Sequence, residues 1–289
     1  EMCIRDSLYT AWVSIKENGR TIDSVEQPFG FRTISWSASD GFYLNGKPII
    51  LNGGCVHHDN GILGAAAYNR AEYRKAEMLK KAGFNAVRTS HNIPSEAFLD
   101  ACDEIGLLVI DEAFDGWRDA KNSHDYHLLF DEWAAKDVAA MVMRDRNHPS
   151  IICWSIGNEI IERKKPEAVK DAAMLAGVCR SIDPARPVTQ ALAAWDPDWE
   201  IYDPLAAEHD IVGYNYMIHK AEGDNDRVPS RVMMQTESYP KDAWSNYRMA
   251  KEHPYVIGDF VWTAIDYIGE SGIGLSLIHI SEPTRHLRI

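Results

Sequence analysis

Apolar and polar residues alternate over residues 8–36, and this period of two predicts β-strands. Asn18-Gly19 interrupts the alternation, a residue pair typical of a two-residue hairpin turn, and the pattern resumes in Thr21–Val25. No helical period appears in this segment. We therefore expect residues 8–38 to be the C-terminal strands of an immunoglobulin-like β-sandwich domain.

Beyond residue 39, short apolar runs typical of buried parallel strands alternate with segments whose apolar residues recur every three or four positions. The predicted strands are 48–53, 84–88, 107–110, 151–154, 187–189, 211–216, 232–235 and 255–262, and the predicted helices are 69–82, 94–105, 126–145 and 167–182. Eight such strands predict an α/β fold, a (β/α)₈ TIM barrel, for a catalytic domain over 39–275 whose last helix we expect to be missing. A doubly wound open sheet is the alternative, which is disfavoured because no glycine-rich phosphate motif follows the first strand.

The two terminal segments of the chain do not fit this pattern of strands and helices. Residues 1–7 and 276–289 resemble translated sequencing-adapter read-through, and we expect both segments to be artefacts. With the native N-terminus expected to be missing, the sequence leaves localisation open.

Composition and charge narrow the possible partners. The 289 residues carry a formal net charge of −13, which argues against nucleic acid or an anionic membrane surface as a partner. No apolar stretch approaches the ~20 residues of a membrane span. The five cysteines are scattered without CxxC spacing, which argues against a zinc site or a disulfide framework. We expect no cofactor, and a homo-oligomer is possible in the full-length parent.

Polar residues follow nearly every predicted strand, always at its C-terminal end. They are His57-His58-Asp59, Arg88 to Asn92, Asp111-Glu112, Asn158-Glu159, Asn215-Tyr216, Glu237, and Trp262. A TIM barrel keeps its chemistry at this end. Glu159 and Glu237 follow the fourth and seventh strands, and two convergent carboxylates are what the cleavage of a glycosidic bond requires.

Taken in order, these motifs resemble glycoside hydrolase family 2, and within it the β-galactosidases. The matching stretches are 52–59, 84–92, 142–150, 154–159, 235–240 and 258–263, and they cover nearly all of 41–275. The resemblance implies a retaining glycosidase that cleaves terminal β-D-galactosides by double displacement. In that reading Glu159 is the general acid/base and Glu237 is the nucleophile.

The resemblance also implies a set of substrate-binding residues: His58, Asp59, Arg88, His91, Asn158, Tyr216 and Trp262. Within this set Asn158 would bind the sugar 2-hydroxyl, Tyr216 would hydrogen-bond the nucleophile, Arg88 would orient it, and Trp262 would lie under the sugar ring. His58 could instead be a structural histidine, and a structural role is favoured for His57.

Several alternatives stay open. A β-glucuronidase or another β-glycosidase of the family is possible, but no Asn-x-Lys motif follows Trp262, and Asp266 and Glu270 would repel a uronate. Asp111 and Glu112 could bind a metal ion, but the loop after them lacks the Glu-x-His pair of metal-binding relatives, so we expect none. The non-enzyme alternative is an inert carbohydrate-binding fragment.

Overall fold

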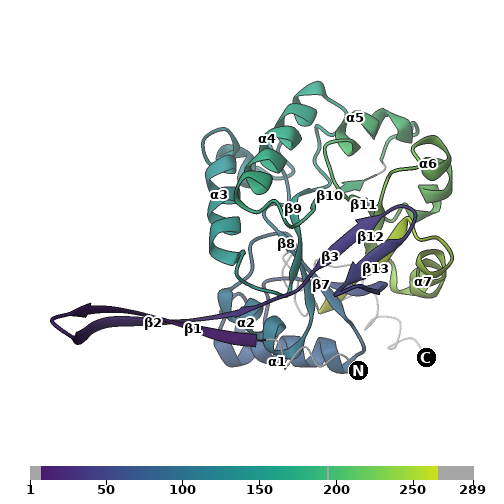
Figure 1. Ribbon diagram of the computed structural model, residues 1–289. Coiled ribbons are helices and arrows are strands. Elements are labelled where there is room, and N and C mark those ends of the chain that lie inside the picture. The colour runs from purple at the N-terminus through teal and green to yellow at the C-terminus, as the bar shows by residue number, and fades with distance from the viewer. Residues whose placement is uncertain (1–7, 194, 266–289) are drawn as a thin grey trace, which may run out of the picture.

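The computed structural model describes residues 8–193 and 195–265. Within them, eight parallel strands close into a barrel (Figure 1). The strands are β6 (Leu51–Val56), β7 (Ala86–Thr89), β8 (Leu108–Glu112), β9 (Ile151–Asn158), β10 (Val188–Ala193), β11 (Val212–Asn215), β12 (Met233–Ser238) and β13 (Val256–Ile265). They follow one another around the barrel in chain order, with β13 pairing β6 to close it. The predicted TIM barrel is confirmed, and the open-sheet alternative is wrong.

The helices form a layer outside the barrel (Figure 1). They are α1 (Asn69–Lys81), α2 (Glu96–Ile105), α3 (Phe130–Asp145), α4 (Pro166–Ile182), α5 (Asp203–Ala206), α6 (Ala221–Arg227) and α7 (Ala243–Glu252). The single helix predicted over 126–145 is divided at Leu129 into a 3-10 turn, η3 (Tyr126–Leu128), and α3. Asp125 starts η3 by accepting the His127 N–H. The short α5 and α6 span too few residues to show a helical period.

A small antiparallel sheet covers the N-terminal end of the barrel. It consists of β3 (Ile34–Ser37), β4 (Gly41–Leu44) and β5 (Lys47–Pro48). Asn45 and Gly46 turn the β4–β5 hairpin with φ of 52° and 72°, the left-handed conformation that a tight hairpin requires. Phe42 and Leu44 of β4 share one apolar cluster with residues that begin the barrel strands, such as Ile257. Since this end is sealed by apolar packing, the opposite, C-terminal end remains for chemistry.

The predicted N-terminal hairpin is present. β1 (Leu8–Glu17) pairs antiparallel with β2 (Arg20–Gly30), and Asn18 and Gly19 make the turn with φ of 50° and 81°. The hairpin forms a two-stranded sheet that projects from the barrel (Figure 1), and nearly all of its residues are exposed. Its assignment to a β-sandwich stays a prediction. The expectations for 1–7, for 276–289 and for a missing last helix concern segments outside the described residues.

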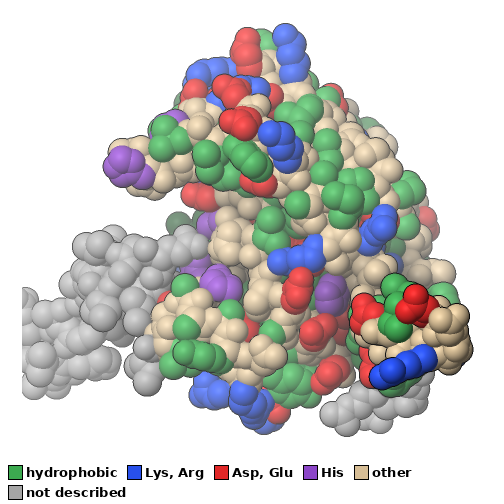
Figure 2. Space-filling view, turned by 90° about the vertical axis from the view of Figure 1, so that its left-hand side faces the viewer, with side chains coloured by type: hydrophobic (Ala, Val, Ile, Leu, Met, Phe, Trp, Pro, Cys, Tyr) green, Lys and Arg blue, Asp and Glu red, His purple; other side chains and the backbone are tan. Residues whose placement is uncertain are grey.

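Acidic and basic side chains are interspersed over the face shown in Figure 2. In the part of the chain that the structure describes, no helix has both the length and the apolar character needed to cross a membrane.

Candidate active site

The barrel brings the predicted site residues to its C-terminal end. Glu159 directly follows β9, Glu237 lies near the end of β12, and Arg88 lies in β7. Three parallel strands that are far apart in sequence thus present their polar residues at one mouth, opposite the β3–β5 sheet. This convergence is what the position of each motif after its strand predicts.

Arg88 is the centre of the site. Its side chain is fully buried, and its Nε and Nη2 donate to the two carboxylate oxygens of Glu112 at 2.8 and 2.9 Å. Nη1 donates to Glu237 Oε1 at 2.9 Å, and Nη2 also donates to Asn158 Oδ1 at 3.0 Å. Burial opposes the guanidinium charge, but its neighbours, Glu112 first among them, outweigh burial and raise the pKa of Arg88. The side chain therefore stays cationic and fixes the nucleophile candidate in place.

Glu112 is held by ordinary protein groups. Besides the Arg88 fork it accepts from Ser155 Oγ at 2.6 Å and pairs with His91 Nδ1 at 2.7 Å. Burial raises the pKa of this carboxyl, but the charge of Arg88 and the His91 contact outweigh burial and lower it. With both oxygens bound to side chains, Glu112 is an anchor for Arg88 and His91.

Asp111 turns the other way, toward Asp145 of α3, and burial together with the Asp145 charge raises the pKa of Asp111 well above its ordinary value.

Two asparagines connect the two glutamates. Asn215, the last residue of β11, donates from Nδ2 to Glu159 Oε1 and to Asn158 Oδ1, both at 3.0 Å. Asn158 in turn accepts from Arg88, which binds Glu237. Thr236 Oγ1 donates to Asn215 Oδ1 at 2.6 Å and so fixes the orientation of the Asn215 amide. A continuous chain of direct hydrogen bonds through Asn215, Asn158 and Arg88 therefore joins the two carboxylates.

Glu159 has the environment of a proton donor. Its side chain is half-buried, and burial, followed by the charge of Glu237, raises the pKa of Glu159 above its ordinary value. Its φ is +39°, the left-handed region that costs a non-glycine residue energy, and its N–H donates to the Ala191 carbonyl of β10 at 2.9 Å. Such strain is concentrated at active sites, where the surrounding structure holds it.

Tyr216 lies beside Glu237. It follows β11 with φ of +59°, and its N–H donates to the Glu237 carbonyl at 2.8 Å. Burial raises the pKa of the Tyr216 hydroxyl, and the charge and hydrogen bond of Glu237 raise it further. The hydroxyl therefore stays protonated beside Glu237, and its role as the hydrogen-bond donor to the nucleophile, which the resemblance implied, stays a prediction.

Trp262 lies in an aromatic group with two histidines. Its ring stacks on His91 at 5.1 Å between centroids and 10° between planes, and it meets His57 edge to face at 5.0 Å. His91 Nε2 is 3.7 Å from Glu237 Oε1. His91 therefore borders the nucleophile candidate and Trp262 packs on His91, while the predicted sugar contacts of both residues stay predictions. His57, for which a structural role was favoured, packs against both rings, whereas the neighbouring His58 does not appear in these contacts.

His58 and Asp59 are engaged in the loop that follows β6. His58 Nε2 is 3.1 Å from the Ala65 carbonyl oxygen, and Asp59 Oδ1 accepts the Gly61 N–H at 2.8 Å. Both contacts shape the loop and neither reaches a glutamate. The predicted sugar contacts of His58 and Asp59 therefore stay predictions.

Lys121 and Asp115 enter the site from the loop between β8 and η3, and the sequence pattern did not single out Lys121. The ammonium Nζ donates to Asp115 Oδ1 at 2.7 Å and to the Asn158 carbonyl at 3.0 Å. Asp115 Oδ1 also accepts from Asn158 Nδ2 at 2.9 Å. Lys121 thus binds the backbone carbonyl of Asn158 and Asp115 binds its side-chain amide, next to Glu159. Lys121 lies nine residues beyond the end of β8, so no spacing rule relates it to a strand end.

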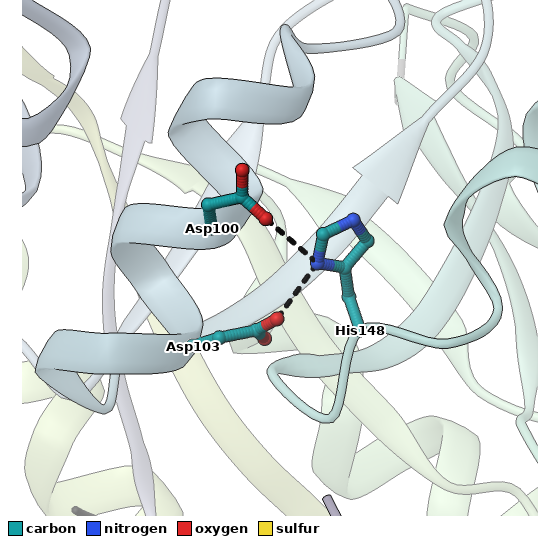
Figure 3. A group of neighbouring side chains, drawn as sticks. All are labelled: Asp100, Asp103 and His148. Atoms are coloured by element: carbon teal, nitrogen blue, oxygen red, sulfur yellow. Dashed lines mark hydrogen bonds and ion pairs between the residues drawn. The ribbon is translucent and has the colours of Figure 1, made fainter. Parts of the chain in front are cut away.

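A second group of ligand-type side chains lies away from the mouth. His148 Nδ1 is 2.7 Å from Asp103 Oδ2 and 4.0 Å from Asp100 Oδ1 (Figure 3), and Asp103 Oδ1 accepts the Ser150 N–H at 2.9 Å. Burial opposes protonation of His148, but its hydrogen bond to Asp103 outweighs burial and raises the pKa. These contacts tie α2 to the loop before β9 and account for the group as a structural ion pair.

The barrel and its linked carboxylates define a TIM-barrel protein with a site of the glycosidase type. Residues 38–271 match the family model described as glycosyl hydrolases family 2, TIM barrel domain. The chain belongs to this family.

Relatives of the chain agree with this assignment. A β-galactosidase of Bacteroides ovatus is 31% identical over 91% of this chain and 40% of its own length. A β-glucuronidase of Canis lupus familiaris is 26% identical over 86% of this chain and 43% of its own length. A family 2 glycosyl hydrolase from Bacteroides cellulosilyticus has a crystal structure with a TM-score of 0.86 and 47% identity over 91% of this chain and 34% of that chain. The chain thus spans less than half the length of these relatives.

Proposed function

We propose that this chain is the catalytic barrel of a retaining β-galactosidase that hydrolyses terminal β-D-galactosides. The observation that carries the proposal is the contrast between the two linked glutamates. Burial and a neighbouring negative charge raise the pKa of Glu159, whereas Glu237 receives a direct hydrogen bond from the Arg88 guanidinium. A carboxyl whose pKa is raised and a carboxylate that a guanidinium holds, at one mouth, supply the two roles of a retaining glycosidase.

In the first step, Glu237 attacks the anomeric carbon of the sugar and Glu159 gives its proton to the departing glycosidic oxygen. The bond to the leaving group breaks and an ester between the sugar and Glu237 forms. Arg88 and the Tyr216 hydroxyl hold the attacking carboxylate at a fixed orientation. In the second step, Glu159 takes a proton from water as the water attacks the anomeric carbon, and the ester breaks. The β-anomer leaves and both glutamates return to their starting states.

The sugar itself is bound by the groups around Glu237. Trp262 offers an aromatic face for the sugar ring, and His91 lies stacked against it. Asn158 lies between Arg88 and Asn215, and its Nδ2 would exchange its contact with Asp115 for the 2-hydroxyl next to the reacting carbon. A hydrogen bond to this hydroxyl strengthens in the transition state.

Electrostatics favour a neutral sugar over a uronate. A uronate carboxylate needs a cation with a free donor, yet the Arg88 donors are engaged by Glu112, Glu237 and Asn158. Lys121 is bound to Asp115 and to the backbone of Asn158. Asp266 and Glu270, expected to repel a uronate, lie outside the described residues. β-Glucuronidase is the second candidate because β-glucuronidases also occur among the relatives.

A panel of aryl β-glycosides tests the proposal, namely the galactoside, glucuronide, mannoside and glucoside, with proton NMR to identify the first sugar anomer released. We expect the galactoside to have the highest kcat/KM and β-galactose to appear first. Glu237→Gln, which keeps the shape but not the nucleophile, is the control and should lose at least ~10³-fold in kcat.

Three results would overturn the proposal. Initial release of the α-anomer would indicate an inverting mechanism. A preference for the glucuronide would establish the second candidate. Binding of galactose without turnover of any glycoside would support the carbohydrate-binding alternative.

A further inference from the structure

An exposed tryptophan lies at the rim of the catalytic mouth. Trp195 is 55% exposed and lies two residues beyond Ala193, the last residue of β10. Exposure of a single aromatic ring is ordinary on a protein surface, so it is the position of Trp195 after a barrel strand that makes it available to a ligand. None of the roles described for the site uses it.

A buried arginine holds the Trp195 ring. The Arg163 guanidinium carbon is 4.4 Å from the ring centroid, a cation–π distance. Arg163 Nη2 also donates to Asp196, the next residue of the loop, at 2.9 Å, and its Nε donates to Tyr202 Oη at 2.9 Å. The arginine is nearly buried, and its contacts order the loop before any ligand arrives. One face of the ring rests on the cation and much of the remaining surface is open to solvent.

The same arginine ties Trp195 to the acid/base candidate. Its Nη1 donates to the carbonyl oxygens of Ile160 and Ile161 at 3.2 and 3.3 Å, and these residues directly follow Glu159. From the other side, the Glu159 N–H donates to Ala191, four residues before Trp195. The loops that carry Glu159 and Trp195 therefore begin side by side, and Arg163 joins them further along.

We propose that Trp195 is the platform on which the leaving-group sugar packs. The inference rests on the proposed function, because the acid donates its proton to the oxygen of the leaving group, which must then lie on the Glu159 side of the bond. Trp262, the platform under the galactose, belongs to β13, and two strands separate β13 from β10 in the barrel. The two tryptophans thus lie on different sides of the mouth, one for each sugar.

This position predicts the class of leaving group. A pyranose ring presents an apolar face of C–H groups that matches the size of an indole, whereas fluoride or a small alcohol cannot reach or cover the ring. The site should therefore favour β-galactosides whose leaving group is itself a sugar over those with a small leaving group.

The test compares two substrates that form the same galactosyl-enzyme, β-galactosyl glucose and β-galactosyl fluoride. In Trp195→Ala we expect the ratio of kcat/KM for the disaccharide over the fluoride to fall about tenfold. Trp195→Tyr, which keeps an aromatic face, should restore most of the ratio. Trp133→Ala is the matched control. Trp133 is 42% exposed, and its ring centroid lies 4.4 Å from the Lys136 ammonium, so it resembles Trp195 in exposure and in its cation contact. It belongs to α3 in the outer helix layer, away from the mouth. This substitution should leave the ratio at the wild-type value.

A second readout uses the reverse direction. With the fluoride as donor and glucose as acceptor, Trp195→Ala should form several-fold less disaccharide relative to free galactose. If Trp195→Ala changes neither the kcat/KM ratio nor the yield of disaccharide relative to free galactose, Trp195 is not the platform. Wild-type turnover of both substrates would in that case still support the proposed function. If wild-type protein turns over neither substrate, the proposed function itself fails.

Discussion

Arg88 reaches two carboxylates at once, with Nε and Nη2 on Glu112 and Nη1 on Glu237. A lysine could not reproduce this geometry, because a single ammonium lacks the planar fork that binds a carboxylate through two donors. The family resemblance implied that Arg88 orients Glu237. The tertiary structure adds that Glu112 anchors the arginine.

The Lys121 ammonium is one of the groups that lower the pKa of Glu159, after the hydrogen bond from Asn215 and together with the Arg88 charge. Burial and the Glu237 charge raise the pKa of Glu159, and the nearby Lys121 ammonium acts against them. Lys121→Met should therefore raise the pKa of Glu159 further. Because the acid must be protonated to act, the basic limb of the kcat/KM profile for the aryl galactoside should move to higher pH.

Lys121→Arg keeps the charge and is the control, for which the basic limb should stay near its wild-type position. A Lys121→Met enzyme that loses the same factor in kcat/KM at every pH, with no shift of the limb, would show that Lys121 only holds the loop and does not act on the pKa of Glu159.

At the scale of elements, the closure of the barrel depends on glycine where β13 meets β6. Gly258 lies opposite Leu51 in this ladder, and a Cβ at Gly258 would lie 2.4 Å from the Leu51 carbonyl oxygen. Backbone atoms on a paired strand cannot move aside without disturbing the hydrogen bonds between the strands. Gly53 of β6 is similarly close to the ring of Phe260, so both strands of the seam need a residue without a side chain.

Gly258→Ala should thus lower the free energy of unfolding by about 1–3 kcal/mol, measured by urea denaturation. Gly177→Ala provides the matched substitution, because Gly177 is exposed in the middle of α4 and a Cβ there would have no neighbour within 4 Å. It should stabilise the protein by about 0.5–1 kcal/mol. Equal effects of the two substitutions would contradict the close packing of β13 on β6.

At the scale of the whole molecule, stability depends on pH through buried carboxyls as well as through the net charge of −13. Asp259 is buried between β13 and α7, where Ser238 and Asn246 donate to it at 3.1 and 3.2 Å. Burial nevertheless raises the pKa of Asp259 to about 7. In the unfolded chain an aspartate ionises near pH 4, so between these values the folded protein holds a proton that the unfolded chain has lost.

The folded protein should therefore lose stability through this group as the pH rises from about 4 to 7, by at most about 1.4 kcal/mol per pH unit. Asp259→Asn imitates the neutral acid and removes this loss. Its advantage over wild type in urea denaturation should grow from about pH 4 to pH 7 and then stay constant.

Asp226→Asn removes the same negative charge from an exposed position on α6 and serves as the reference. If its advantage over wild type has the same pH dependence as that of Asp259→Asn, general charge repulsion and not the burial of Asp259 governs the effect.

The periodicity of apolar and polar residues along the chain was sufficient to predict most of the fold. Strong apolar runs such as Ile151–Trp154 and clear turn pairs such as Asn18-Gly19 appear in the structure as predicted. The helices α5, α6 and α7 were not predicted, and the four residues of α5 are too few for a helical period, so its conformation is set by its surroundings. The predicted helix over 126–145 failed at Leu129 because Asp125 starts a separate turn, a local hydrogen bond that periodicity does not register.

The sequence by itself determined the barrel, the end of the barrel that carries the chemistry, and the two glutamates. These follow from strand period and from the polar residue placed after each strand, which are local properties of the chain. Only the tertiary structure decided that Arg88 binds Glu112 as well as Glu237, that His57 packs on Trp262 while His58 faces its own loop, and that Lys121 reaches Asn158. These contacts join residues from different strands and loops, and their distances and burial, which set charge and orientation, come into existence only when the barrel closes.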